Sequence, residues 1–136
     1  MSQAKILIAE DTRIVALDIQ SRLRDWGYAV PAVVSSAEEA ICKAAETGPD
    51  LMLMDIKLKG KMDGIEAAAY IKAQFGIPVI YLTAYLDRDT LQRARSTEPL
   101  GYVTKPFEER ELATTIERAL ASTNWPTGHG KLAKWP

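Results

Sequence analysis

The sequence of 136 residues predicts an α/β fold, in which short buried strands alternate with amphipathic helices. Three observations support this prediction. Continuous apolar runs recur along the chain, and the segments between them carry apolar residues at helical spacing. The apolar fraction of 47% and the charged fraction of 26% are those of an ordinary globular domain, which excludes intrinsically disordered and low-complexity chains. A chain of this length forms one domain of common size.

Five segments are predicted to be strands. Runs that are apolar on both faces are typical of parallel strands with helices on both sides of the sheet. A further segment, residues 29–34, contains Pro31. Because proline has no N–H to donate to a neighbouring strand, this strand is expected at the edge of the sheet. The four apolar runs are residues 6–9, 51–54, 79–82 and, more weakly, 101–104.

Five segments are predicted to be helices. Ser36 with Glu39 is the pattern of a capping box, in which two helix donors are satisfied reciprocally. Asp63 is a favourable N-cap, and Gly76 ends the third helix. The first helix carries an apolar stripe, and the later helices are expected at residues 37–46, 64–75, 87–96 and 108–121. The stripe consists of Ile14, Val15, Ile19, Leu23 and Trp26.

The alternation of strands and helices predicts right-handed crossovers and an open parallel sheet. Doubly wound sheets have two common strand orders. In the flavodoxin-like order the second strand lies at an edge, which agrees with Pro31. We therefore predict a flavodoxin-like (βα)5 sheet of five parallel strands in the order 2-1-3-4-5, with helices on both faces.

The composition argues against several kinds of function. The 17 basic and 18 acidic residues give a net charge of -1, so direct nucleic-acid binding is not expected. The one cysteine, Cys42, excludes an internal disulfide and is expected in the core, and the one histidine, His129, excludes a Cys/His zinc site. Since no apolar run approaches the ~20 residues that span a bilayer, membrane insertion is not expected. The N-terminus does not resemble a signal peptide, which makes the cytoplasm the expected location.

Polar residues follow four of the predicted strands. Glu10 and Asp11 follow the first, Asp55 the third, Thr83 the fourth and Lys105 the fifth. Because the carboxyl ends of parallel strands meet at one edge of the sheet, and neighbouring strands are ~4.8 Å apart, these side chains should share one small pocket.

This set of groups suits phosphoryl transfer with a bound metal. Three clustered carboxylates repel one another, and a divalent cation removes the conflict. Since the available ligands are oxygens, Mg²⁺ is the first choice. Lys105 supplies a positive charge for an anion, and the Thr83 hydroxyl can donate to a phosphoryl oxygen. A carboxylate can itself be the nucleophile, and Asp55 is the best candidate because it directly follows a buried strand.

Each of these residues also has a structural explanation. Asp11 could cap the first helix, Asp55 could be an ordinary loop acid, and Thr83 could stabilise a turn. Lys105 could be a solvated lysine, and Tyr102 a half-buried strand residue. The placement of four such groups at four strand ends favours the functional interpretation.

The chain resembles the receiver domain of two-component response regulators over about residues 4–121. The resemblance rests on five motifs in the family's order: residues 6–11, residues 51–55, Met62-Asp63-Gly64, residues 79–84 and residues 102–107.

The resemblance implies specific roles for the site residues. Asp55 is implied to be the phosphoacceptor, and Thr83 and Lys105 to contact the phosphoryl group. Thr83 and Tyr102 are implied to be the switch residues, and the Lys105–Pro106 bond to be cis. The implied Mg²⁺ ligands are Glu10, Asp11, Asp55 and the backbone carbonyl of Lys57.

The implied function is signal transduction. A histidine kinase or phosphotransfer protein would donate the phosphoryl group to Asp55. The face built by the fourth helix, fifth strand and fifth helix would then change for a downstream target, and a homodimer could form through it. Such a chain catalyses only its own phosphorylation and dephosphorylation, so it is not expected to be an enzyme in the ordinary sense. Residues 1–121 would be the receiver domain, and residues 122–136 a flexible tail or linker stub.

Some features depart from the commonest receiver pattern, among them a proline in residues 97–101, before the fifth strand. The first acid is Glu10, where aspartate is more frequent. The loop of residues 56–62 lacks the proline that many members carry, is one residue longer before Asp63, and contains three lysines.

Three other functions are alternatives to a phosphoacceptor receiver. The chain could be a docking module that works without phosphorylation, or the receiver segment of a larger hybrid histidine kinase. A haloacid-type phosphatase also uses an aspartate nucleophile, but it would need an acid at the position of Lys57.

Overall fold

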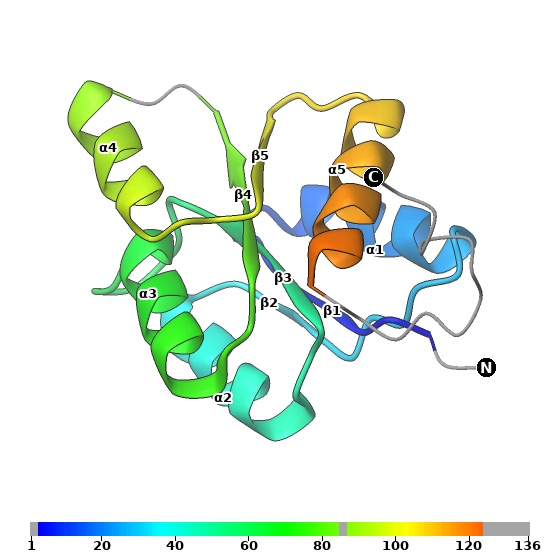
Figure 1. Ribbon diagram of the computed structural model, residues 1–136, viewed down its shortest axis with the longest axis horizontal. Coiled ribbons are helices and arrows are strands. Elements are labelled where there is room, and N and C mark those ends of the chain that lie inside the picture. Colours follow the sequence, from blue (N-terminus) through cyan, green and yellow to red (C-terminus); the bar gives the residue numbers. More distant parts are fainter. Residues whose placement is uncertain (1–2, 85–86, 124–136) are drawn as a thin grey trace.

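The computed structural model describes residues 3–84 and 87–123 and contains a parallel five-stranded sheet between two layers of helices (Figure 1). The strand order is β2-β1-β3-β4-β5, and every pairing is parallel. The predicted fold class and strand order are therefore confirmed. The strands are β1 (Ile6–Ala9), β2 (Val33–Val34), β3 (Leu51–Asp55), β4 (Val79–Thr83) and β5 (Gly101–Thr104). The helices are α1 (Arg13–Asp25), α2 (Ala37–Thr47), α3 (Gly64–Phe75), α4 (Arg88–Ser96) and α5 (Glu109–Ser122).

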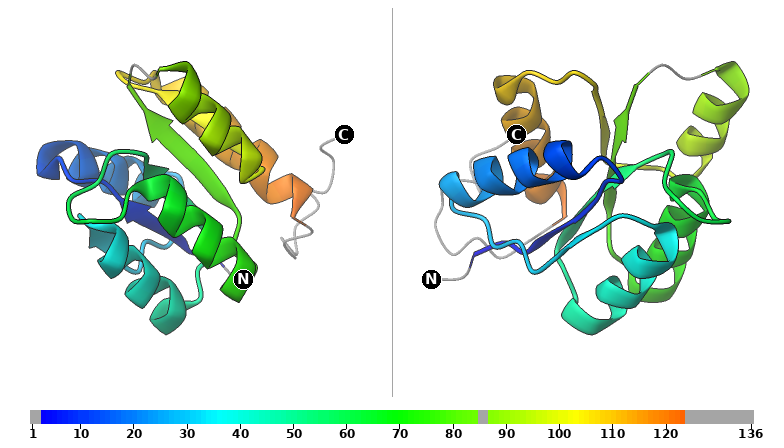
Figure 2. Two further views of the ribbon diagram at one scale, coloured as in Figure 1. Left: turned by 90° about the vertical axis from the view of Figure 1, so that its left-hand side faces the viewer. Right: turned by 180° about the vertical axis from the view of Figure 1, so that it is seen from behind.

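The sheet separates two apolar cores, and successive residues of each strand alternate between them. Ile6 and Ile8 of β1 face α1 and α5, whereas Leu7 and Ala9 face the other side, with α2 and α3. The views of Figure 2 show the helices on opposite sides of the sheet. Every residue of β1, β3 and β4 is buried, which is why these segments read as continuous apolar runs.

The second strand lies at the edge of the sheet but is much shorter than predicted. It comprises Val33 and Val34, and a single bridge between Lys5 and Ala29 precedes it. Pro31 lies outside the strand and is exposed. The missing donor of Pro31 is thus consistent with both the edge position and the late start of the ladder.

The first helix does not present the predicted stripe in full. Ala16, Ile19 and Leu23 are its buried residues, whereas Ile14 is 82% exposed. The three buried residues recur at i, i+3 and i+7, and this spacing defines the face that meets the sheet. The prediction for Cys42 was also wrong, because this residue is exposed on α2.

The predicted caps hold, with one change. The Ser36 hydroxyl accepts a hydrogen bond from the Glu39 N–H, but the Glu39 carboxylate accepts from the N–H of Ser35 at 3.2 Å instead of closing a reciprocal box. A complete capping box forms at α3, where Asp63 and Glu66 each accept from the other's backbone N–H. Asp87 and Glu108 are N-cap residues of α4 and α5, so both helices begin one residue later than predicted.

None of the helices in the described part of the chain combines the length and the apolar character needed to cross a membrane. The predicted tail, from residue 124 onward, lies outside the described residues, as do His129 within it and Tyr85.

Candidate functional site

The sheet brings the predicted site residues to one edge. Asp55 ends β3 and Thr83 ends β4, while Glu10 and Lys105 directly follow β1 and β5. The register keeps these ends level, because Ala9 pairs with Met54, Asp55 with Leu82, and Thr83 with Thr104. They border a cavity of about 210 Å³ that is lined by Asp11, Asp55, Ile56, Lys57, Thr83, Ala84 and Lys105.

Three carboxylates converge beside this cavity. Glu10, Asp11 and Asp55 each offer one oxygen, and the three oxygens lie within 4.8 Å of one another. Glu10 and Asp55 are buried, with 1% and 6% exposure. Burial, followed by the charge of Glu10, raises the pKa of Asp55 to about 6, although the hydrogen bonds of Lys105 and the Lys57 N–H act in the opposite direction. A cluster of oxygen ligands that repel one another fits a hard divalent cation such as Mg²⁺.

The Lys105 ammonium lies between two of these carboxylates. Its Nζ is 3.1 Å from Oδ2 of Asp55 and 2.5 Å from Oε1 of Glu10. Burial alone lowers the pKa of Lys105, but its interactions with the two acids outweigh this effect and raise it. The Lys105–Pro106 bond is cis, as the family resemblance implies. Lys105 is therefore not the ordinary solvated lysine of the structural interpretation, since its side chain is only 21% exposed.

Of the remaining predicted residues, Lys57 and Thr83 line the same cavity as Asp55, whereas Tyr102 does not. The Lys57 N–H donates to Oδ1 of Asp55 at 3.1 Å. The hydroxyl of the buried Thr83 donates to the Ala84 carbonyl at 3.0 Å, so it is directed toward the backbone of the next residue. Tyr102 is half-buried on β5, and its ring centroid lies 6.1 Å from that of Tyr81.

The N-terminus of α3 packs directly behind Asp55. A Cβ atom on Gly64 would lie 2.0 Å from the carbonyl oxygen of Asp55, so a side chain at this position would displace one of the two backbones. The Gly64 N–H also donates to the carbonyl of Ile56 at 2.8 Å. The Asp63-Gly64 pair thus caps α3 and also fixes the backbone that carries Asp55.

The alternative role of Asp11 as a helix cap is not observed. Thr12 occupies the N-cap position of α1, and its side chain makes no capping hydrogen bond. The half-buried Asp11 instead borders both the cavity beside Asp55 and a second, larger cavity.

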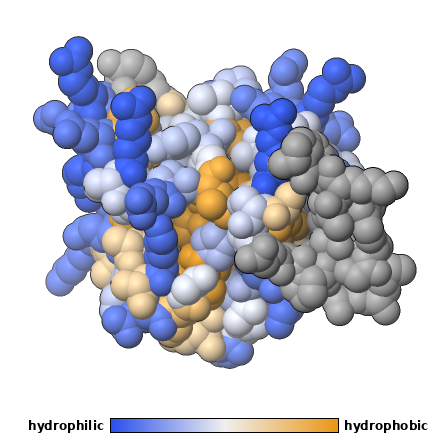
Figure 3. All heavy atoms as spheres, viewed as in Figure 1, coloured by the Kyte–Doolittle hydropathy of each residue, from blue (hydrophilic) through white to orange (hydrophobic). Residues whose placement is uncertain are grey.

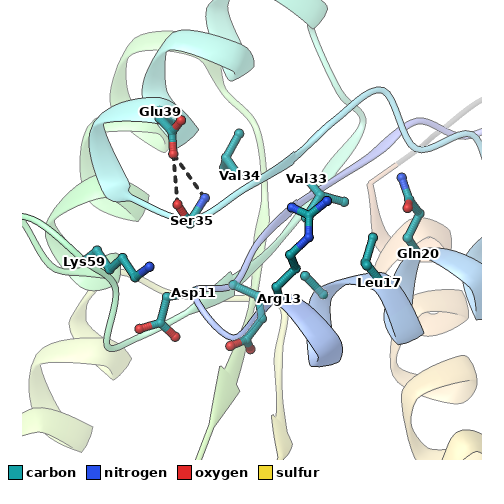
Figure 4. A pocket seen from close by; sticks show the side chains of 11 residues that line it. Asp11, Arg13, Leu17, Gln20, Val33, Val34, Ser35, Glu39 and Lys59 are labelled. Atoms are coloured by element: carbon teal, nitrogen blue, oxygen red, sulfur yellow. Dashed lines mark hydrogen bonds between the residues drawn. The ribbon is translucent and has the colours of Figure 1, made fainter.

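This second cavity, of about 420 Å³, lies between α1, the residues before α2 and the loop after β3 (Figure 4). It is lined by Asp11, Arg13, Glu39 and Lys59 together with apolar residues of α1 and β2. No sequence motif predicts this cavity, because none spans the three segments. Its greater volume does not make it the better candidate site, since Asp55, Thr83 and Lys105 all line the smaller one.

Two further contacts near the site were also missed. Arg93 of α4 forms an ion pair with Asp63 at 3.0 Å, and the Tyr81 hydroxyl lies 2.7 Å from Oγ1 of Thr97. The sequence offers no signal for either contact, because both depend on how α4 packs against its neighbours.

Comparison with known proteins gives one consistent result. A family model described as the response regulator receiver domain matches residues 6–117. The transcriptional regulatory protein PdtaR of Mycobacterium tuberculosis is 36% identical over 117 residues, which cover 86% of this chain and 57% of that protein. The transcriptional regulatory protein ZraR of Escherichia coli is 38% identical over 120 residues, which cover 88% of this chain and 27% of that protein. The chain thus spans about half of the first relative and about a quarter of the second.

Solved structures agree with the sequence matches. The signal receiver domain of a modulated diguanylate cyclase from Desulfovibrio desulfuricans superposes with a TM-score of 0.86 at 36% identity, covering 90% of this chain and 98% of that one. The N-terminal domain of a response regulator/sensory box/GGDEF protein from Carboxydothermus hydrogenoformans superposes with a TM-score of 0.80 at 37% identity, covering 88% of this chain and 96% of that one.

Proposed function

The chain belongs to the response regulator receiver family, and we propose that it accepts a phosphoryl group on Asp55 from a histidine kinase or a phosphotransfer protein. The observation that carries this proposal is the convergence of Glu10, Asp11 and Asp55 with the Lys105 ammonium at one sheet edge. Three strand ends contribute to this arrangement, those of β1, β3 and β5, and structural roles for the single residues would not require it. We also propose residues 1–121 as the receiver domain and the cytoplasm as its location.

In this proposal Asp55 is the nucleophile. One carboxylate oxygen forms a bond to phosphorus as the bond from phosphorus to the histidine nitrogen breaks, and the nitrogen leaves with the electron pair. The Lys105 ammonium already contacts Oδ2 of Asp55, so it is placed to neutralise the oxygens of the transferred group. Attack of water on phosphorus later releases phosphate and restores the carboxylate.

A divalent cation would be held by Glu10, Asp11, Asp55 and the backbone carbonyl of Lys57. When bound, Mg²⁺ supplies positive charge that offsets the charge of the carboxylates and the phosphoryl oxygens. The donor set supports this assignment, since the three converging groups are all carboxylates.

The proposed readout begins at Thr83. Its hydroxyl donates to Ala84 and would turn toward a phosphoryl oxygen on Asp55, after which Tyr102 would follow. This exchange would shift a pre-existing equilibrium between two surface states.

The face formed by α4, β5 and α5 is our proposed contact for a downstream target or a second copy of the chain. Figure 3 shows this side of the molecule, with apolar residues in the middle and hydrophilic residues around them. Tyr102 of β5 is half-buried, and Leu100, which directly precedes β5, is 37% exposed.

The test is a labelling experiment with Asp55→Asn as the paired variant. The protein is incubated with Mg²⁺ and a small acyl-phosphate donor, and its intact mass is measured. The expected result is the gain of one phosphate that depends on Mg²⁺ and is absent in the variant.

Labelling that survives in Asp55→Asn would contradict the assignment of the nucleophile. If the wild-type protein gains no mass, titration with beryllofluoride separates two explanations. A Mg²⁺-dependent response at Asp55 would show that the acceptor site is competent but requires its cognate kinase. The lack of a response would favour the docking module that works without phosphorylation.

A further inference from the structure

The two carboxylates beside Lys105 are held in the same way. One oxygen of each accepts a backbone N–H, from Thr12 to Oε2 of Glu10 at 3.0 Å and from Lys57 to Oδ1 of Asp55 at 3.1 Å. The other oxygen of each faces the Lys105 ammonium. Oε1 of Glu10 is fully buried and has no hydrogen-bond partner among the described residues, so this ion pair is its main compensation.

The position of Lys105 conflicts with a metal at the same acids. Mg²⁺ binds oxygen at about 2.0–2.1 Å, and its ligand oxygens must face the ion. In the structure, the oxygens of Glu10 and Asp55 that accept no backbone N–H already contact the ammonium. Two cations that share these oxygens repel each other strongly in a buried site. A metal ion and Lys105 should therefore compete for Glu10.

We infer that Glu10 is a positioning residue for Lys105, and that a divalent cation at the Glu10, Asp11 and Asp55 cluster releases Lys105 from Glu10. This inference rests on the proposed function, because the released ammonium is the group that would meet the phosphoryl oxygens. Metal binding would thus prepare the lysine as well as the acids. Until the metal binds, Lys105 is the counterion of the acid cluster.

The length of the Glu10 side chain is central to this role. Aspartate at this position would be shorter by one C–C bond, about 1.5 Å. The contact with Lys105, now 2.5 Å, would then open to roughly 4 Å, beyond hydrogen-bond distance. Glu10→Asp should therefore keep a carboxylate at this position but remove its contact with Lys105.

The test is a double-mutant cycle on Mg²⁺ affinity. Wild type, Lys105→Met, Glu10→Asp and the double variant are titrated with Mg²⁺, with the amide NMR signals of residues 10–12 and 55–57 as the readout. Lys105→Met should tighten Mg²⁺ binding by about tenfold with Glu10 present, and by at most about threefold with aspartate there, a difference within the range of groups in direct contact.

Lys59→Met is the matched charge control. Lys59 is exposed on the loop after β3 and lines the larger cavity together with Asp11 (Figure 4). Its loss removes one positive charge near the acids without removing a contact to Glu10. It should change Mg²⁺ affinity only slightly, and by the same factor with glutamate or aspartate at position 10.

A second readout needs no variant. The Cε signal of Lys105 should shift on saturation of the wild-type protein with Mg²⁺, because the ammonium leaves Glu10. An unchanged signal would overturn the inference, and so would an equal effect of Lys105→Met in both backgrounds. In either case the proposed function would stand if Asp55 still accepts phosphate. If none of the proteins bound Mg²⁺, both the inference and the metal-dependent mechanism would fail.

Discussion

The raised pKa of Asp55 has a consequence for stability. Burial and the charge of Glu10 raise this pKa from 3.8 to about 6, so the folded protein binds a proton that the unfolded chain has already lost at pH 5. The contribution of Asp55 to the free energy of unfolding is therefore highest below pH 4 and falls as the pH rises through 6. The loss is at most about 3 kcal/mol, from roughly two pH units at 1.36 kcal/mol each.

Asp55→Asn should accordingly stabilise the metal-free protein at neutral pH. Since asparagine stays uncharged, the variant should exceed wild type by about 1–3 kcal/mol at pH 7.5, and the difference should shrink toward pH 4. Urea unfolding at both pH values in the presence of a chelator measures this. Asp25→Asn, at an exposed position on α1, is the control that should show no such gain. An Asp55→Asn variant less stable than wild type at pH 7.5 would contradict the argument.

At the scale of single residues, the sequence located the candidate site better than it located the contacts within it. Asp55, Thr83 and Lys105 could be placed together because each follows a strand, and parallel strands end at one edge. The contact of Lys105 with Glu10 could not be predicted, since it depends on side-chain length and rotamer. Cys42 was misplaced because a small apolar residue on a helix carries no information on which face it occupies.

Among the elements, α4 has the least apolar anchoring. Ala94 is its one buried residue, and polar contacts hold its C-terminal end. The Thr97 hydroxyl donates to the Ala94 carbonyl at 2.7 Å, so the Tyr81 hydroxyl must donate to Oγ1 of Thr97. Lys72 of α3 adds a hydrogen bond to the Thr97 carbonyl at 3.0 Å. These bonds tie the end of α4 to β4 and α3.

Tyr81→Phe should loosen this end of α4. The change removes one buried hydrogen bond and keeps the ring, so the expected cost is about 1 kcal/mol. Amide hydrogen exchange should become faster from Arg93 to Thr97 and stay unchanged in α1 and α5. Tyr28→Phe, in the segment after α1, is the matched control that should leave α4 exchange unchanged. Equal exchange in α4 of Tyr81→Phe and wild type would show that the Tyr81 hydrogen bond does not hold this end of the helix.

The helices were easier to predict than the edge strand. Helix α3 begins after Asp63 and ends before Gly76, as predicted. Both boundaries depend on residues close in sequence, an N-cap side chain and a glycine with φ of 68°. Strand β2 depends on its partner instead, and its apolar run from Ala29 pairs continuously only from Val33. Apolar residues that pack in the core need not all form backbone hydrogen bonds with a neighbouring strand.

At the scale of the whole molecule, strand order follows from general rules. Alternating strands and helices require right-handed crossovers, and a proline in the segment predicted as the second strand favours an edge. Together these select the order 2-1-3-4-5, which the structure confirms. The same order makes β1, β3, β4 and β5 consecutive neighbours, so topology alone gathers the acids, the hydroxyl and the ammonium. The proposed chemistry is thus a consequence of how the sheet is wound.

The ten elements of the described part of the chain lie between Ile6 and Ser122, so we expect a chain cut after Thr123 to fold and function as the full chain does. We expect its melting temperature, Mg²⁺ affinity and labelling at Asp55 to match those of the 136-residue protein. A cut after Phe107 is the contrasting variant, because it removes α5 with Leu112, Ile116, Ala119 and Leu120. Burial of each larger side chain contributes roughly 1.5–3 kcal/mol, and a whole domain is stable by only about 5–15 kcal/mol, so this shorter chain should not fold. Circular dichroism melting and intact-mass labelling of the two chains measure both expectations. Loss of labelling in the chain cut after Thr123 would show that residues beyond the receiver fold take part in the reaction.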